Sequence, residues 1–62
     1  MKKYIVNVPP TWEQGSYVTI VSTEWDRRYR QLALEDYNSA RQHDGLPPIQ
    51  RMPKGTKYTK IG

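Results

Sequence analysis

Asp36 and His43 are the two side chains whose types first suggest acid–base chemistry, because a carboxylate can orient an imidazole for proton transfer. Their separation along a helix would be about 10 Å, which is too far for a direct hydrogen bond. The chain has no cysteine and no second histidine to complete a nucleophilic or metal-binding group. We therefore expect no enzyme, no metal and no cofactor. Asp36 should instead accept a hydrogen bond from Tyr4, Tyr17 or a lysine of the C-terminal tail, and His43 should cover the last helical turn.

A stripe of arginines around Leu34 is the best candidate for a binding surface. Its members recur at helical spacing and fall almost opposite the apolar side of the same helix. Arginine is enriched at the energetic centres of protein interfaces, and cations steer association with an acidic partner. We interpret the stripe as a docking ridge for a protein with an acidic surface; an ordinary solvated helix back is the plainer alternative. The ridge comprises Arg27, Arg30, Leu34, Asn38 and Arg41.

The C-terminal tail is a second candidate. Residues 51–62 hold four basic residues and no acid, whereas residues 1–50 are neutral, so the tail carries the whole net charge of +4. Cations at every third position would align along one edge of a polyproline-like chain, where they could follow a phosphate backbone, whereas in a flat strand they would alternate between the two faces. This pattern favours non-specific nucleic-acid binding as the alternative function, and a solubilising tail is the simpler interpretation. The residues involved are Arg51, Lys54, Lys57, Tyr58 and Lys60, with the Tyr58 ring stacking on an exposed base.

Two segments rich in β-branched and aromatic residues predict strands, over residues 3–8 and 16–22. The Pro-Pro pair that follows the first strand ends it, because proline cannot donate to a ladder. The linker 9–15 is too short for a parallel crossover, so an antiparallel hairpin is expected. Trp12 lies in this linker. We expect it to fold back as a lid on the small core, the alternative being an anchor for a partner.

The strongest structural prediction is a helix from Thr23 to Asp44. Ser22 and Thr23 are N-cap candidates, and acidic residues follow them where the first helical turn would lie. Two acid–base pairs at i,i+4 spacing would support these turns. They are Glu24 with Arg28, and Asp26 with Arg30.

The apolar residues of this helix recur on one side, which should cover the hairpin, so that removing Trp25 or Tyr29 should destabilise the fold. Beyond the helix, Gly45 suits the left-handed conformation of a Schellman ending and Leu46 supplies the hydrophobic contact that accompanies it. The two prolines that follow prevent further helix. The apolar side comprises Trp25, Tyr29, Leu32, Ala33, Tyr37 and Ala40.

These elements predict one small α+β domain, in which an antiparallel β-hairpin packs on one long α-helix. Residues 1–50 form this body, and the basic tail 51–62 either adds a short edge strand near 56–61 or stays free. A chain of 62 residues buries only about 60% of its unfolded surface, which excludes a large interior pocket and a multi-domain enzyme. No apolar run approaches the roughly 18 residues of a membrane span, and no signal-peptide core is expected.

The sequence contains no phosphate-binding loop and no dinucleotide fingerprint. A compact, cysteine-free chain without catalytic groups resembles, in style only, the small accessory proteins of bacteriophages and mobile elements; no motif and no site residue comes with that resemblance. We expect a non-enzymatic, cytoplasmic inhibitor-like protein that docks on a host macromolecule, a protein before a nucleic acid, and modulates or blocks it. Self-association as a homodimer through the open sheet is a third interpretation, and no membrane partner is expected.

Overall fold

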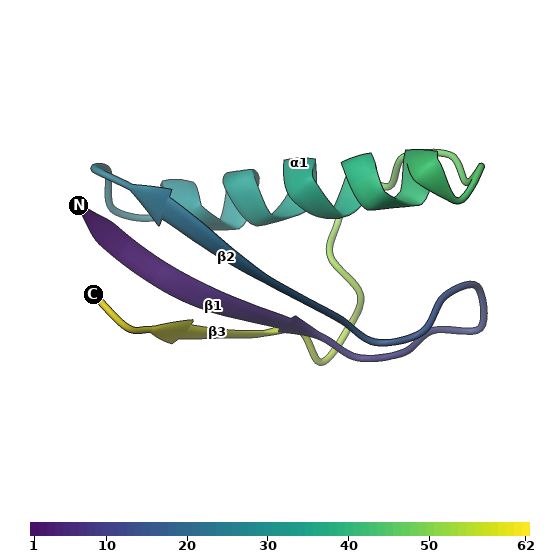
Figure 1. Ribbon diagram of the computed structural model, residues 1–62, viewed down its shortest axis with the longest axis horizontal. Coiled ribbons are helices and arrows are strands. Elements are labelled where there is room, and N and C mark those ends of the chain that lie inside the picture. Colours follow the sequence, from purple (N-terminus) through teal and green to yellow (C-terminus); the bar gives the residue numbers. More distant parts are fainter.

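Three antiparallel strands form one open sheet in the order β2-β1-β3, and a single helix covers one of its faces (Figure 1). The structure is a computed structural model and describes residues 1–62. This architecture confirms the predicted hairpin packed on a helix, and it shows that the tail adds a third strand on the free side of β1. The elements are β1 (Lys2–Val8), β2 (Tyr17–Thr23), α1 (Arg28–His43) and β3 (Lys57–Lys60).

Strand β1 is the centre of the sheet and pairs on both sides. Ile5 lies opposite Ile20 of β2, and Val6 lies opposite Tyr58 of β3. Because side chains alternate between the two faces of a sheet, the even-numbered residues of β1 face α1 and the odd-numbered ones face away. Val6 accordingly is fully buried beneath the helix, whereas Ile20 remains exposed on the uncovered face.

The core is small and is closed at its margin by aromatic rings. Tyr37 and Val6 are its largest fully buried side chains. At one edge Tyr29 stacks on Tyr4 with ring centroids 3.9 Å apart, and Leu32 packs against the core from the helix. The predicted apolar side of the helix is therefore confirmed for Tyr29, Leu32, Ala33 and Tyr37. The buried core comprises Val6, Val8, Val21, Ala33 and Tyr37.

The helix begins at Arg28, so the predicted start at Thr23 was wrong. Thr23 is buried as the last residue of β2, where it pairs with Lys2. Its hydroxyl accepts the Trp25 N–H at 3.0 Å and donates to the Trp25 carbonyl at 3.2 Å, which closes a tight turn. Trp25 lies in that turn and is 69% exposed, so it does not belong to the apolar side of the helix.

The predicted acid–base pairs of the first turns are not formed, because Glu24 and Asp26 precede the helix. Asp26 forms an ion pair with Lys2 at the start of β1. The hydrogen bond between them is the main cause that lowers the pKa of Asp26 and raises the pKa of Lys2. The chain then enters the helix through Arg27, whose φ of 70° is a left-handed conformation that costs free energy for a residue with a side chain.

The end of the helix follows the prediction. The Leu46 N–H donates to the Arg41 carbonyl at 2.9 Å, and the Gly45 N–H donates to the Gln42 carbonyl at 3.0 Å. These are the two hydrogen bonds of a Schellman motif, and Gly45 has the positive φ of 75° that the motif requires. His43 lies in the last turn, as expected.

The loop between β1 and β2 is held by Thr11, whose hydroxyl accepts the N–H groups of Glu13 at 3.2 Å and Gln14 at 3.1 Å. Trp12 projects from this loop and is 93% exposed. The prediction that it forms a lid on the core was wrong, because its side chain lies on a loop that extends beyond the ends of β1 and β2 (Figure 1).

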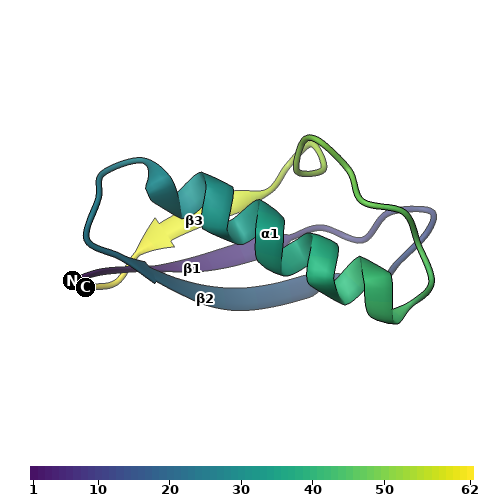
Figure 2. The same ribbon diagram turned by 90° about the horizontal axis from the view of Figure 1, so that it is seen from above.

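The tail is not a free arm, because its last residues pair with β1. The Ile61 N–H donates to the Lys3 carbonyl at 2.8 Å, and the Lys3 N–H donates to the Gly62 carbonyl at 3.1 Å. The two ends of the chain therefore lie side by side (Figure 2). The helix α1 is not long and apolar enough to cross a membrane.

Candidate docking site

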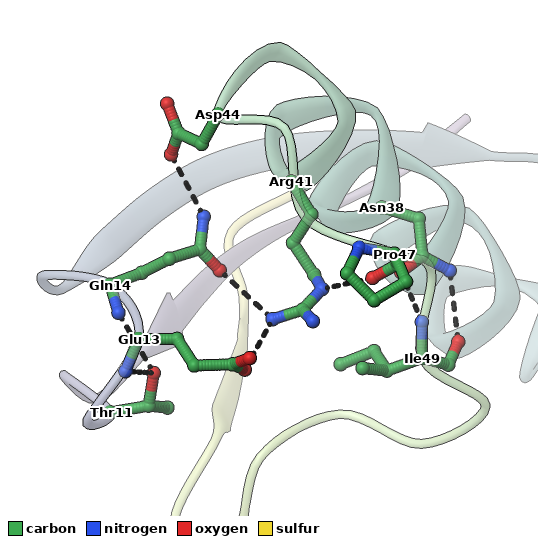
Figure 3. Close-up of polar contacts among 8 residues, drawn as sticks. All are labelled: Thr11, Glu13, Gln14, Asn38, Arg41, Asp44, Pro47 and Ile49. Atoms are coloured by element: carbon green, nitrogen blue, oxygen red, sulfur yellow. Dashed lines mark hydrogen bonds and ion pairs between the residues drawn. The ribbon is translucent and has the colours of Figure 1, made fainter.

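Two members of the predicted ridge, Asn38 and Arg41, fasten the segment that follows the helix. The Asn38 Nδ2 donates to the Ile49 carbonyl at 3.0 Å, and its Oδ1 accepts the Ile49 N–H at 2.9 Å. The Arg41 Nε donates to the Pro47 carbonyl at 2.8 Å (Figure 3). The chain therefore runs back along the flank of α1, and the ridge is not a continuous exposed surface.

Arg41 is buried, which contradicts its expected exposure on the ridge. Its Nη1 donates to Glu13 Oε1 at 3.0 Å and to Gln14 Oε1 at 3.3 Å, and the Gln14 Nε2 donates in turn to Asp44 Oδ2 at 3.0 Å (Figure 3). A buried charge is tolerated only when it is paired and hydrogen-bonded. Arg41 meets this condition by joining the hairpin loop, the end of the helix and the return segment.

The sequence contains a signal for this burial that a helical wheel does not use. A helix that ends at Gly45 and continues as Leu-Pro-Pro must send the chain back along one flank to reach the third strand. Figure 2 shows this return segment beside α1 on the side of β3. The proline-rich segment has carbonyl groups that need donors, and the polar side chains of Asn38 and Arg41 supply them.

Two further members of the ridge meet the tail at a shallow hollow between α1 and residues 50–58, which we call the basic hollow. Arg30 and Leu34 come from the helix, while Arg51 and Tyr58 come from the return segment and β3. No acidic residue lines the hollow. The structure thus brings together, on one surface, residues of the two predicted sites. Its lining includes Arg30, Leu34, Arg51, Met52, Thr56 and Tyr58.

Arg30 is held in place by aromatic rings. Its guanidinium carbon lies 5.1 Å from the centroid of the Tyr58 ring and 5.7 Å from that of Tyr29, which are cation–π distances. Its Nε donates a long hydrogen bond of 3.4 Å to the Tyr29 hydroxyl, and this contact raises the pKa of Arg30 above its ordinary value. Neither Nη1 nor Nη2 of Arg30 has a hydrogen-bond partner in the protein, so the N–H groups of both nitrogens are available to a ligand.

The Tyr58 ring is engaged inside the molecule. It meets Tyr29 edge-on with centroids 5.3 Å apart, and burial raises the pKa of its hydroxyl although Arg30 opposes the shift. One face of the ring lies under the guanidinium. That face of Tyr58 is therefore not free to stack on a base.

A turn forms the far wall of the hollow. The N–H and the hydroxyl of Thr56 donate to the Pro53 carbonyl at 3.2 and 2.6 Å. Gly55 has φ 93°, and a Cβ there would lie 3.4 Å from Cγ of Pro9, so the turn packs closely against the loop after β1. Arg51 is exposed, and the next residue, Met52, packs against the core and so holds this segment in place.

The remaining predicted cations are dispersed. Arg27 is exposed at the entry to the helix, and Lys54 is exposed in the turn. Lys57 lies opposite Asn7 and faces away from α1, whereas Lys60 lies opposite Tyr4 and faces the helix side. The regular spacing in the tail therefore does not align its charges, because β3 is a strand.

Asp36 and His43 form no hydrogen bond with each other, because Asp36 has a partner on β2. The Tyr17 hydroxyl donates to Asp36 Oδ2 at 3.0 Å, which confirms the expected role of Asp36. Burial is the main cause that raises the pKa of Tyr17, and Asp36 adds to it. His43 is exposed, and no group of three or more histidine or acidic side chains is placed to hold a metal ion.

Comparison with known proteins gives no family to which these residues can be aligned. No protein-family model matches the chain, and neither a curated protein nor a solved structure matches it. A function can accordingly be inferred only from the residues of the basic hollow and from their geometry.

Proposed function

We propose that the chain is a non-enzymatic binding protein that docks on an acidic surface of a partner protein through the basic hollow. The observation that carries the proposal is the lining, in which two arginines lie beside the apolar side chains of Leu34 and Met52 with no acid among them. A planar guanidinium presents paired donors that match a carboxylate. Because Arg30 is already stacked on Tyr58, it loses little side-chain entropy when it binds.

A protein partner suits this surface better than a nucleic acid does. A phosphate backbone repeats its charge along a line and rewards cations that follow the same line. The lysines at 54, 57 and 60 are distributed over a turn and the two faces of β3. The apolar part of the hollow instead fits a segment that carries both a carboxylate and an apolar side chain.

Docking of this kind would modulate or block the partner by covering one of its surfaces. The cations would steer the encounter, and the few desolvated contacts at Leu34 and Met52 would set the rate of dissociation. We also propose a cytoplasmic setting, because small secreted domains usually depend on disulfides and this chain has no cysteine.

Photo-crosslinking tests the proposal. A crosslinking residue at Gln31, which lines the hollow, is compared with one at Ser39, which lies on the same helix outside it. In a lysate of the cells that produce the protein, Gln31 should capture a protein through an acidic segment, and Ser39 should not. The charge reversal Arg51→Glu should abolish the capture, whereas Arg28→Glu, an exposed helix position outside the hollow, should not. If the same protein is captured from Gln31 and from Ser39, and Arg51→Glu does not reduce the capture, the proposal is contradicted.

A salt titration against duplex and single-stranded oligonucleotides examines the alternative function. We expect no binding at low salt. Tight binding whose logarithm falls steeply with the logarithm of salt concentration would transfer the assignment to nucleic acid.

A further inference from the structure

The two edges of the sheet are protected differently. Strand β3 has four residues, two of which are Lys57 and Lys60, and such short charged edges prevent unwanted pairing. Strand β2 has seven residues and contains no charge, no proline and no glycine. No strand pairs with its outer side, and Figure 2 shows it along the border of the sheet. Strand β2 is therefore an unprotected template for another strand.

The hydrogen bonds of the sheet show which backbone groups of β2 are free. The Ile61 N–H donates to the Lys3 carbonyl, so the odd-numbered residues of β1 direct their backbone groups at β3 and the even-numbered ones direct theirs at β2. Tyr4 lies opposite Val21 in an unbroken register, so the backbone N–H and C=O groups of the odd-numbered residues of β2 form hydrogen bonds with β1. The residues whose N–H and C=O groups point outward are Val18, Ile20 and Ser22.

We propose that β2 pairs with β2 of a second copy of this chain, antiparallel and about a two-fold axis at Ile20, to form one continuous sheet. Ile20 then lies opposite Ile20 of the second copy, and Val18 lies opposite Ser22. All three outward residues exchange main-chain hydrogen bonds in this register. The contact is isologous, so it closes as a dimer and leaves β3 at each outer edge.

The side chains of β2 favour a second copy as the occupant of this edge. Pairing through β2 brings no like charges together, whereas pairing through β3 would place lysines against lysines. Val18 and Ile20 are 61% and 59% exposed on the face away from α1. In the paired sheet Ile20 lies directly opposite its own copy and Val18 is its diagonal neighbour, and such cross-strand contacts stabilise a sheet. The basic hollow lies beside β3, so this proposal does not depend on the proposed function.

The pairing adds main-chain hydrogen bonds but little buried area, so a weak dimer that depends on concentration is expected. Amide hydrogen exchange is therefore measured by NMR over a concentration series up to about 1 mM, with sedimentation equilibrium in parallel. The amides of Val18, Ile20 and Ser22 should become protected together as the mean mass rises towards that of two chains. The amides of the alternate residues should be protected at every concentration.

The variant Ser22→Pro isolates the edge, because it removes an outward N–H and leaves both the β1 ladder and the exposed aliphatic side chains in place. It should weaken dimerisation by about tenfold or more. Lys60→Pro is the matched control, since it removes an outward N–H from the β3 edge, and it should leave the dimer unchanged. Should Ser22→Pro fail to fold, Ser22→Glu replaces it with the same expectation, because it places a charge on the β2 edge while its neighbour in the β1 ladder is Lys3. A chain that stays monomeric throughout the series, or a dimer that is indifferent to the Ser22 variants, overturns the proposal.

Discussion

The guanidinium of Arg41 and the carboxylate of Glu13 meet at 3.0 Å, although the two residues are 28 positions apart in the sequence (Figure 3). The side chain of Arg41 is only 4% exposed, and that of Glu13 is 24% exposed. A buried ion pair contributes little net stability compared with well-packed apolar residues, but removing one partner leaves an uncompensated charge. The pair therefore fixes where the hairpin loop lies against the end of the helix.

The substitution Glu13→Leu should destabilise the protein by about 2–3 kcal/mol, which is less than for a fully buried pair, because Glu13 is partly exposed and Arg41 keeps neutral acceptors. The double variant with Arg41→Met should recover most of this loss, since no buried charge then remains. Urea denaturation followed by circular dichroism measures both. A double variant that is as unstable as the single one would show that hydrogen bonds, and not the charge, make the contact important.

Trp25 and Tyr29 should respond differently to truncation, although the sequence pattern gives them the same role. Trp25 is largely exposed, so Trp25→Ala should change the free energy of unfolding by less than about 1 kcal/mol. Tyr29 is half-buried between Tyr4 and Tyr58, so Tyr29→Ala should cost about 2–4 kcal/mol. Thermal unfolding of the two variants side by side makes the comparison. An equal loss of stability in both would contradict the exposed position of Trp25.

Arg27→Gly should stabilise the protein by up to about 1 kcal/mol, because glycine adopts the left-handed conformation at this position without strain. The gain is reduced by the greater freedom that glycine gives the unfolded chain. Gly45→Ala is the opposite control. The φ of Gly45 is also positive, so alanine there should lower the free energy of unfolding by about 1 kcal/mol. Urea midpoints that move in the same direction for both variants would contradict the conformations assigned here.

Local signals made the fold predictable from the sequence. The alternating β-branched residues, the short linker and the Gly-Leu-Pro-Pro ending each act within a few residues of one another. The start of the helix was not predictable in this way. The Thr23 side chain is suited to an N-cap, but the residue instead pairs with Lys2 as the last residue of β2. The competition between a helix cap and a strand end is decided by a residue of the partner strand that is far away in the sequence.

The candidate site was predictable only in part, because contacts between residues far apart in the sequence decide which side chains remain exposed. Arg30, Leu34 and Arg51 were singled out by charge and spacing, and they line the basic hollow. The exposure of Arg41 and Asn38 depends on which segment later covers that flank of the helix. A helical wheel treats the helix as isolated, so it cannot distinguish an arginine that awaits a partner from one that already has one within the chain.

Tyr37→Phe should leave stability unchanged or raise it slightly. Tyr37 is 1% exposed, and its hydroxyl has no hydrogen-bond partner in the protein. Burying an unpaired hydroxyl costs about 1–3 kcal/mol, and phenylalanine fills nearly the same volume without that cost. Equilibrium unfolding of the variant checks this. A loss greater than about 1 kcal/mol would mean that the hydroxyl is satisfied in solution.

High pH should weaken the fold through its half-buried tyrosines. Burial is the main cause that raises the pKa of both Tyr17 and Tyr58 above the ordinary value of 10.0. A raised pKa means that the folded state holds the phenol proton more tightly than the unfolded state does. The resulting stability is fully present below about pH 10 and is lost as the pH rises towards the folded-state pKa.

Urea unfolding between about pH 8 and pH 11 should therefore show a free energy of unfolding that falls at the alkaline end. Lys2 acts in the same direction, because its pKa is also raised, so the variant Tyr17→Phe is needed to separate the contributions. This variant should show a shallower alkaline decline than the parent protein, with tyrosinate absorbance reporting the ionisation directly. Identical declines in the parent and in Tyr17→Phe would show that Tyr17 ionises as freely in the folded chain as in the unfolded one.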